Sequence, residues 1–391
     1  MIQVSRRSNS IEYAIRDVVV EADKLEKQGH KILKLNIGDP NKYDFDTPEF
    51  IKEAYIEAIK FKDNGYSSSE GIKILREAIV KREQEFHNLD INSDKIIITS
   101  GVSEALLFLF GALVEEGDQI LIPGPSYPPY ISFVKYFGGI PVEYRTIEQE
   151  NWQPDLKDIE EKINDKTKAI VIINPNNPTG ALYSKEVIQE MIKIIKKNNL
   201  LLISDEIYDQ LSFGEHISPC TFAENIPFVQ LNGLSKAYLA PGWRIGNMNF
   251  SNNNENLYDA CIKQARIRLC ANHQAQFAYA KALNTKSDFI KEVRTKIQQR
   301  GEYAYKRLNE IKGLSATKPN GAFYIFPKIE DKRFQDDKKF VLDLLEKKKV
   351  LFVYGIGFGE EYGKGHFRSV VLPCLDILKE AFDKVEEFLK E

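Results

Sequence analysis

The stretch that decides the fold runs N-G-L-S-K-A-Y-L-A-P-G-W-R-I-G over residues 232–246. It follows a short strand-like run and places Lys236 eight residues before Arg244, in a segment punctuated by glycine and proline. A lysine in such a loop is usually only a solvated charge. Two earlier stretches favour a second interpretation: N-P-N-N-P-T-G at 174–180 and S-D-E-I-Y at 204–208, each of which ends a run of apolar residues.

Together these three stretches supply an amine, a carboxylate, a phenol, an amide and a guanidinium. An aldehyde cofactor that carries a pyridine ring and a phosphate would need this set of groups. The sequence therefore predicts a site in which three separate loops meet around one ligand.

Apolar runs alternate with helical patterns along most of the chain, which predicts an α/β fold with a mostly parallel sheet. A-I-V-I-I at 169–173 and L-L-L-I at 200–203 are unbroken apolar runs, typical of strands that are covered on both faces. In open parallel sheets, ligands bind beyond the carboxyl ends of the strands. We therefore expect the loops that begin at Asn174, Asp205 and Gly233 to share one rim.

The chain resembles the fold-type I pyridoxal phosphate enzymes of the class I/II aminotransferase family, and most closely their alanine (glutamate–pyruvate) aminotransferase branch. The likeness covers essentially the whole length, from I-R-D-V-V-V-E-A and K-I-L-K-L-N-I-G through I-N-P-N-N-P-T-G to I-R-L-C-A-N and H-F-R-S. It implies a large cofactor-binding domain over residues 45–285 and a smaller α+β domain formed by residues 1–44 and 286–391. Helical patterns predict two long helices after the lysine loop, at 254–283 and 287–312.

The resemblance implies pyridoxal 5'-phosphate as the cofactor, with Lys236 as its covalent partner and then as the general base and acid. Asp205 would form a salt bridge to the protonated pyridine nitrogen, while Tyr208 and Asn177 would donate to the phenolate oxygen of the ring. Two simpler interpretations stay open from the residues alone. Asp205 is also typical of a helix cap or turn, and Asn177-Pro178-Thr179-Gly180 is typical of a turn.

The phosphate of the cofactor would be held from two sides. Ser235 and Arg244 provide one side, with the guanidinium acting as a two-pronged donor. Gly101, Val102 and Ser103 provide the other, because a strand, a glycine and a helix start together present backbone N–H groups to an anion. An ordinary helix start at Ser103 and a surface ion pair of Arg244 are the alternatives.

Four further residues match substrate or cofactor contacts of the family. Tyr127 matches the aromatic residue that stacks on the cofactor ring, although a tyrosine in a proline-rich loop is more often a surface packing residue. Arg368 and Gly38 match the groups that bind the α-carboxylate of the substrate. Tyr66 matches a tyrosine that reaches the phosphate of the neighbouring subunit, which implies a homodimer with shared sites.

Tyr13 and Arg16 form the pattern Y-x-x-R, one turn apart on one face of a predicted N-terminal helix. In the alanine aminotransferase branch the matching pair lies over the site and meets the second carboxylate of glutamate. The alternative is that both residues only pack the helix on the small domain.

Composition excludes several other classes of protein. The net charge is −3, so no global field favours nucleic acid or an anionic membrane. No apolar run reaches membrane-spanning length, and the first residues lack a signal-peptide core, so we expect a cytoplasmic protein. The cysteines have no C-x-x-C spacing and are expected to be small core residues. The histidines are isolated in the sequence, which predicts no metal site; they are His30, His87, His216, His273 and His366.

The predicted function is a ping-pong amino transfer between L-alanine and 2-oxoglutarate. Asp39 stands where bacterial members of the branch tend to have asparagine, so aspartate, aromatic or broad specificity is the alternative. A carbon–sulfur lyase that uses the same lysine is a further alternative. A cofactor-binding transcriptional regulator is disfavoured because no helix-turn-helix domain precedes the core. A dinucleotide-binding dehydrogenase is disfavoured because no G-x-G-x-x-G follows a strand.

Overall fold

The computed structural model describes the whole chain except residues 1, 6, 9–10, 12–13 and 62–63. Its largest element is an eight-stranded sheet in the order β2-β9-β8-β7-β6-β3-β4-β5. The strands are β2 (Ile96–Thr99), β3 (Gln119–Gly124), β4 (Ile140–Ile147), β5 (Gln153–Pro154), β6 (Thr167–Ile173), β7 (Leu201–Asp205), β8 (Phe228–Gly233) and β9 (Gly246–Phe250).

Most of this sheet is parallel, as predicted. β4, β3, β6, β7 and β8 pair in parallel, whereas β9 runs antiparallel between β8 and β2, and β5 is antiparallel to β4. The carboxyl ends of β2, β3, β6, β7 and β8 therefore lie on the same edge. This arrangement confirms the shared rim expected for the loops that begin at Asn174, Asp205 and Gly233.

Both faces of the sheet are buried, and the side chains of β6 show how. Val171 belongs to one apolar core, whereas its neighbours Ile170 and Ile172 belong to the other. This alternation follows from the two-residue repeat of a strand, and helices must cover both faces. The first core is closed by α4 (Val102–Leu113), α5 (Pro128–Tyr136) and α8 (Glu255–Arg268); the second includes α3 (Lys73–His87), α6 (Leu156–Lys162), α7 (Lys185–Lys197) and α9 (His273–Asn284), with α2 (Glu49–Phe61) packed against α9.

The sequence of α7 explains why this segment is helical. Ser184 caps its amino end by accepting a hydrogen bond from the Val187 N–H at 3.3 Å. Ile188, Met191 and Ile195 recur at helical spacing and are buried. The apolar stripe therefore faces the sheet, and the lysines of the last turn lie at the end where a helix favours cations.

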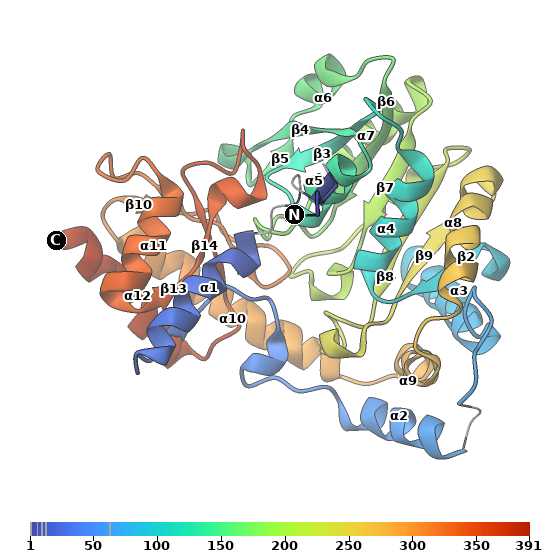
Figure 1. Cartoon of the computed structure of the whole chain (residues 1–391), viewed down its shortest axis with the longest axis horizontal. Helices are drawn as coiled ribbons and strands as arrows, with labels where there is room; N and C mark the ends of the chain where they lie inside the picture. The colour runs from blue at the N-terminus through green and yellow to red at the C-terminus, as the bar shows by residue number, and fades with distance from the viewer. Residues whose placement is uncertain (1, 6, 9–10, 12–13, 62–63) are drawn as a thin grey trace.

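The N-terminal helix lies among C-terminal elements, as Figure 1 shows by the blue α1 (Ala14–Lys27) beside the orange and red helices. β1 (Leu33–Lys34) pairs in parallel with β13 (Val350–Leu351) and so joins chain segments that are far apart in sequence. The remaining elements are α10 (Phe289–Glu310), α11 (Asp337–Lys348), α12 (Leu375–Lys390), β10 (Leu314–Ser315), β11 (Tyr324–Ile325), β12 (Lys328–Ile329), β14 (Val353–Tyr354) and β15 (Phe367–Val370). Within the described residues, no helix is long and apolar enough to cross a membrane.

The single helix predicted at 254–283 is wrong, because the chain forms two helices there, α8 and α9. Leu269 ends α8 with a positive φ of 79°, and Asn272 then accepts a hydrogen bond from the Ala275 N–H at 3.0 Å. Asparagine at this position starts a new helix by satisfying a free N–H group.

The cysteine prediction is half right: Cys220 and Cys261 are buried, whereas Cys270 and Cys374 are partly exposed.

Arg300 on α10 forms hydrogen bonds to two distant segments of the chain, at Asp44 and at Leu372. Its side chain is 6% exposed and donates to Asp44 at 2.6 Å and to the Leu372 carbonyl oxygen. It also lies 5.0 Å from the ring centre of Phe45. Lys296 reaches the same Asp44 carboxylate at 2.7 Å, but it is 40% exposed.

We predict that Arg300→Ala lowers the free energy of unfolding by about 2–3 kcal/mol, because buried hydrogen bonds and packing are lost together. Lys296→Ala is the matched control, and its effect should stay below about 1 kcal/mol because exposed ion pairs contribute little. Urea denaturation of both variants measures the difference. Equal losses would contradict the assignment of the stabilisation to Arg300.

Candidate active site

A cavity of about 440 Å³ lies at the carboxyl edge of the sheet, where the predicted loops meet. It is also lined by Tyr324 and Arg368 from the C-terminal part and by Ile37 and Gly38 from the N-terminal part. The cavity therefore brings most of the predicted site residues together. Those that line it are Arg16, Gly38, Val102, Ser103, Tyr127, Asn177, Asp205, Tyr208, Ser235, Lys236, Arg244 and Arg368.

Three predicted residues do not line this cavity. Gly101 lies directly behind it, against the guanidinium of Arg244. Tyr66 is 80% exposed, so its own chain does not bring it to the site. Tyr13 lies outside the described residues, whereas Arg16 on the same predicted helix is an exposed side chain at the cavity.

The amine of Lys236 projects into the cavity and donates to the carbonyl oxygen of Gly38 at 2.9 Å. Burial and the nearby Arg368 guanidinium lower the pKa of Lys236 to about 8. Both effects disfavour the ammonium form, so a substantial fraction of the amine is neutral at mildly alkaline pH. Only glycine fits at position 38, because a Cβ there would lie 2.2 Å from the Tyr324 hydroxyl oxygen.

Asp205 is buried at the end of β7, with 3% of its surface exposed. Its Oδ2 accepts a hydrogen bond from the Tyr130 hydroxyl at 2.8 Å, and its Oδ1 accepts one from the Ile207 N–H at 3.2 Å. Burial raises the pKa of Asp205 to about 6, although both hydrogen bonds act in the opposite direction. The carboxylate is held in a fixed orientation, and no described residue places a cation in hydrogen-bond contact with it, so a cationic group of a ligand would stabilise it.

The opposite part of the cavity suits an anion. α4 begins at Val102, and no side chain caps its amino end. Val102 and Ser103 line the cavity, so the positive end of the helix dipole and its free N–H groups lie beside it. Arg244 lies beside them and donates to the carbonyl oxygen of Ser100 at 3.2 Å. Gly101 permits this approach, because a Cβ there would lie 2.5 Å from Arg244 Nη2.

Arg368 is 1% exposed and lies between two aromatic rings, 4.5 Å from the ring centre of Tyr324 and 4.7 Å from that of Phe358. It donates to Asn177 Oδ1 at 2.9 Å and to the Asn36 carbonyl oxygen at 2.6 Å. Its Nε is buried and has no hydrogen-bond partner in the part of the chain that the structure describes. A buried guanidinium that faces a cavity with a free donor is suited to a carboxylate ligand.

Two functional side chains were not identified from the sequence. Tyr130 orients Asp205, and Tyr324 exchanges a hydrogen bond of 2.8 Å with the hydroxyl of Tyr208. Both are partners of predicted residues across the fold, at separations of 75 and 116 residues, so no local motif could reveal them.

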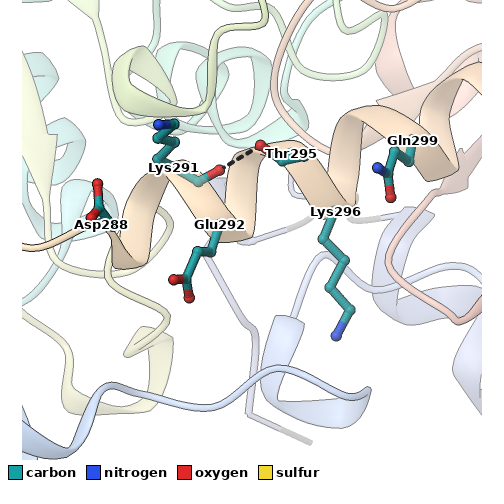
Figure 2. A pocket seen from close by; sticks show the side chains of 6 residues that line it. All are labelled: Asp288, Lys291, Glu292, Thr295, Lys296 and Gln299. Atoms are coloured by element: carbon teal, nitrogen blue, oxygen red, sulfur yellow. Dashed lines mark hydrogen bonds between the residues drawn. The ribbon is translucent and has the colours of Figure 1, made fainter.

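A second hollow lies along α10 and contains none of the predicted residues (Figure 2). It is lined by Asp288, Lys291, Glu292, Thr295, Lys296 and Gln299, all from one helix. Thr295 hydrogen-bonds the carbonyl oxygen of Lys291 in its own helix at 2.8 Å, and the other side chains diverge. Charges that diverge from one helix do not surround a ligand, so the hollow is not a candidate active site.

The fold and the cavity define a class of protein: an α/β enzyme with a half-buried lysine amine and two separate places for anionic groups. The sequence matches the family model for class I and II aminotransferases over residues 30–377. The structure is similar to that of an alanine aminotransferase from Pyrococcus furiosus, with 54% identity, a TM-score of 0.97, and coverage of 99% of this chain and 100% of that one.

Two further relatives cover nearly the same length. A glutamate–pyruvate aminotransferase, AlaA, from Haemophilus influenzae is 40% identical, with 98% of each chain covered. A probable aspartate/prephenate aminotransferase from Aquifex aeolicus is 34% identical, with 96% of this chain and 95% of that protein covered. The chain belongs to the class I and II aminotransferase family.

Family membership implies pyridoxal 5'-phosphate as the cofactor, and the cavity fits it. The uncapped start of α4 and Arg244 suit the phosphate, the buried Asp205 carboxylate suits a ring cation, and the Lys236 amine suits the aldehyde. The positive balance of the cavity also suits an anionic cofactor and substrate, because four cationic side chains line it against two carboxylates: Arg16, Lys236, Arg244 and Arg368 against Asp39 and Asp205.

We predict that Lys236 in the cofactor-free protein reacts with an amine-modifying reagent half-maximally near pH 8, because burial and Arg368 lower its pKa to about 8. Exposed lysines should reach half their maximal rate only at about pH 10.4, the pKa of an unperturbed lysine amine. Peptide mapping of the modified protein across pH separates Lys236 from the other lysines. A Lys236 profile that coincides with theirs would contradict the assigned environment.

Proposed function

We propose that this chain is an aminotransferase that exchanges the amino group of L-alanine with 2-oxoglutarate. The observation that carries the proposal is the single cavity that joins the Lys236 amine, the Asp205 carboxylate and the Arg368 guanidinium. The full-length similarity to proteins named alanine and glutamate–pyruvate aminotransferases supports the choice of substrates.

Bound pyridoxal phosphate supplies an aldehyde that takes up the amino group and a ring that accepts electrons from the substrate α-carbon. Asp205 stabilises the ring cation, since its carboxylate is already oriented by Tyr130. Asn177 and Tyr208, which line the cavity, would donate hydrogen bonds to the cofactor, and Tyr127 would pack against its ring. Ser235 and Arg244, with the backbone at Gly101, Val102 and Ser103, hold the phosphate.

Lys236 is the proposed proton carrier. Its neutral amine would remove the proton from the substrate α-carbon, and the resulting ammonium would return that proton to the carbon of the cofactor, which regenerates the neutral amine. A pKa of about 8 suits both roles, because neither form is strongly disfavoured near neutral to mildly alkaline pH. Arg368 and the backbone at Gly38 hold the substrate α-carboxylate, which presents the α-carbon hydrogen to the lysine.

The reaction has two halves. Alanine gives up its amino group and leaves as pyruvate, and 2-oxoglutarate then enters the same cavity and leaves as glutamate. The cavity must accept a methyl side chain and a propionate side chain in turn. Arg16 at the cavity, with Tyr13 near it in sequence, is the proposed partner of the second carboxylate.

We also propose the domain division and the assembly. Residues 45–285 would form the cofactor-binding domain, and residues 1–44 with 286–391 the smaller one; the β1–β13 pairing supports the return of the N-terminal segment to the C-terminal part. A homodimer with shared sites is supported by the exposure of Tyr66 and of apolar side chains near it in sequence, Ile59 and Phe61. A cytoplasmic location completes the proposal.

The first test of the proposed reaction is the absorption spectrum of the cofactor-loaded enzyme with single amino acids. L-Alanine should bleach the visible cofactor band, and 2-oxoglutarate should restore it, whereas Lys236→Ala should show no turnover. A larger response to L-aspartate or L-phenylalanine would favour the aspartate or aromatic alternative. Release of pyruvate and ammonia from a β-substituted amino acid without any acceptor would favour the lyase.

A second test separates the two arginines. Arg368→Gln should raise KM for alanine and for glutamate alike by about 100-fold, because a charge-assisted hydrogen bond contributes up to about 3 kcal/mol. Arg16→Gln should raise KM for glutamate and 2-oxoglutarate and leave KM for alanine and pyruvate nearly unchanged. The two variants serve as controls for each other, and equal effects of Arg16→Gln on both substrate pairs would contradict its proposed role.

A further inference from the structure

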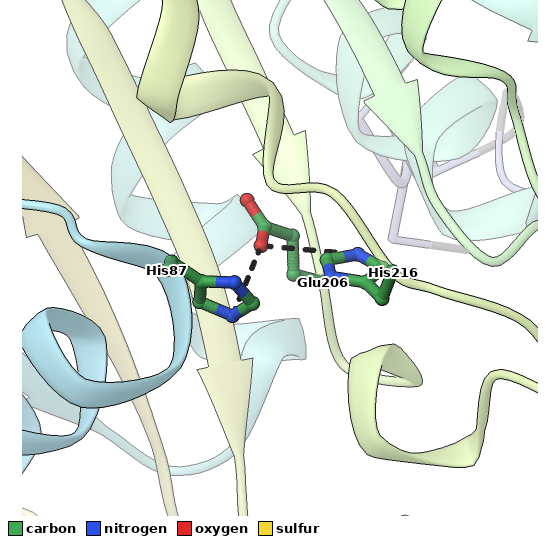
Figure 3. A group of neighbouring side chains, drawn as sticks. All are labelled: His87, Glu206 and His216. Atoms are coloured by element: carbon green, nitrogen blue, oxygen red, sulfur yellow. Dashed lines mark ion pairs between the residues drawn. The ribbon is translucent and has the colours of Figure 1, made fainter.

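Two of the five histidines, which are isolated from each other in the sequence, meet inside the protein. The rings of His87 and His216 lie 5.3 Å apart, although 129 positions separate them in the sequence. Glu206 lies between them, as Figure 3 shows. His87 ends α3, Glu206 follows β7, and His216 lies in the loop after it, so three distant segments converge on one point.

The three side chains are buried: His87 is 6% exposed, Glu206 0% and His216 7%. One ligand atom from each can be chosen so that all lie within 4.8 Å of one another. His87 Nε2 is 3.9 Å from Glu206 Oε2 and 3.6 Å from Asp209 Oδ2, both beyond hydrogen-bond range. The three side chains are therefore close enough to bind one ligand together, but too far apart to hydrogen-bond to one another.

Each member of the cluster leaves a polar atom without a partner. His87 Nε2, Glu206 Oε2 and His216 Nδ1 are all buried, and none of them has a hydrogen-bond partner among the described residues. Buried polar atoms are rarely left unpaired, because each one costs the free energy of its lost hydration. Three such atoms in one cluster are placed so that one ligand could satisfy all of them.

The remaining atoms of the cluster are held in place by hydrogen bonds. Glu206 Oε1 accepts from the hydroxyls of Ser204 at 2.8 Å and Ser218 at 2.7 Å, which leaves Oε2 as the free oxygen. His216 Nε2 is 3.1 Å from the carbonyl oxygen of Asn174, which fixes Nε2 as the donor and Nδ1 as the nitrogen with a free lone pair. Metal-binding histidines are commonly oriented in this way, by donating their other N–H group to a carbonyl oxygen.

The charges around the cluster favour a cation. Arg82 already contacts Glu83 and Asp209, so its charge is shared between two other carboxylates. Three carboxylates, Glu83, Glu206 and Asp209, therefore face a single guanidinium in this part of the core. A cavity of about 660 Å³ that is lined by His87, Asp209 and His216 adjoins the cluster and provides a route for a hydrated ion.

We propose that His87, Glu206 and His216 form a binding site for a divalent transition-metal ion of the zinc type. Two imidazoles and one carboxylate are the ligands that such ions prefer, whereas calcium and magnesium require more oxygen atoms. A water molecule from the adjoining cavity fills the fourth position. In a tetrahedral zinc site the ligand atoms lie roughly 3.3 Å apart, so the three side chains draw together on binding.

The proposed role of the metal is structural, because it would hold the end of α3 and the loop of His216 against the end of β7. Glu206 is the residue next to Asp205, and the Asn174 carbonyl oxygen that orients His216 begins the loop that carries Asn177. The metal therefore lies behind the active-site rim and stiffens two of its loops. Amino transfer itself needs no metal step, so this inference stands apart from the proposed function.

The test uses the cofactor-loaded enzyme, treated with a chelator and then dialysed against micromolar Zn²⁺. The wild-type protein should retain about one zinc ion per chain more than the double variant His87→Gln/His216→Gln by elemental analysis. Its unfolding midpoint should rise by about 3 °C at a free zinc concentration near 100 times Kd. His30→Gln, which removes an exposed histidine, is the matched control and should behave as the wild type.

Cobalt provides a measurement that does not depend on the variants. Co²⁺ in the wild-type enzyme should give a visible d–d spectrum typical of nitrogen and oxygen ligands, without the charge-transfer band of a thiolate. Circular dichroism and the cofactor band verify that the double variant is folded. Equal zinc content in the double variant and the wild type would overturn the proposal, as would a thiolate spectrum or a stabilisation by Mg²⁺ equal to that by Zn²⁺.

Discussion

Parallel pairing of β6, β7 and β8 is the constraint on which the site depends. Ile173 pairs with Asp205, and Asp205 pairs with Leu231, so the three strands end within about two residues of the same level. The loops that follow these strands therefore start next to one another, and Asn177, Asp205 and Lys236 all line one cavity. β9 completes this edge in the antiparallel direction, which allows β2 to present the start of α4 at the same level.

The free-energy cost of burying a charge explains why Arg368 and Asp205 are surrounded by hydrogen-bonding and aromatic partners. Arg368 is almost fully buried, yet it is placed between two aromatic rings and donates to two oxygens, which compensates for its lost hydration. Asp205 is treated similarly by Tyr130 and the Ile207 N–H group. Each charge is thus fixed before any ligand arrives, so little reorganisation is needed when complementary charges bind.

Two carboxylates at the end of β7 are adjacent in the sequence but point to opposite faces of the sheet. Asp205 lines the active-site cavity, whereas Glu206 lies with His87 and His216 on the other side. Successive side chains of an extended segment point to opposite faces, so adjacent carboxylates can serve different environments. The histidine–carboxylate cluster therefore supports the same loops as the active site without contact with its cavity.

The sequence by itself determined the α/β class, the parallel strands and the motif residues of the cavity. These properties depend on local patterns: unbroken apolar runs, glycine-rich loops and polar residues placed directly after strands. The break between α8 and α9 escaped because the apolar pattern continues across it, while the Asn272 cap acts through one hydrogen bond. Only the tertiary structure decided the partners Tyr130 and Tyr324 and the meeting of His87 with His216. Such contacts join residues 75 to 129 positions apart, and sequence spacing carries no information about pairs that only the packed fold brings together.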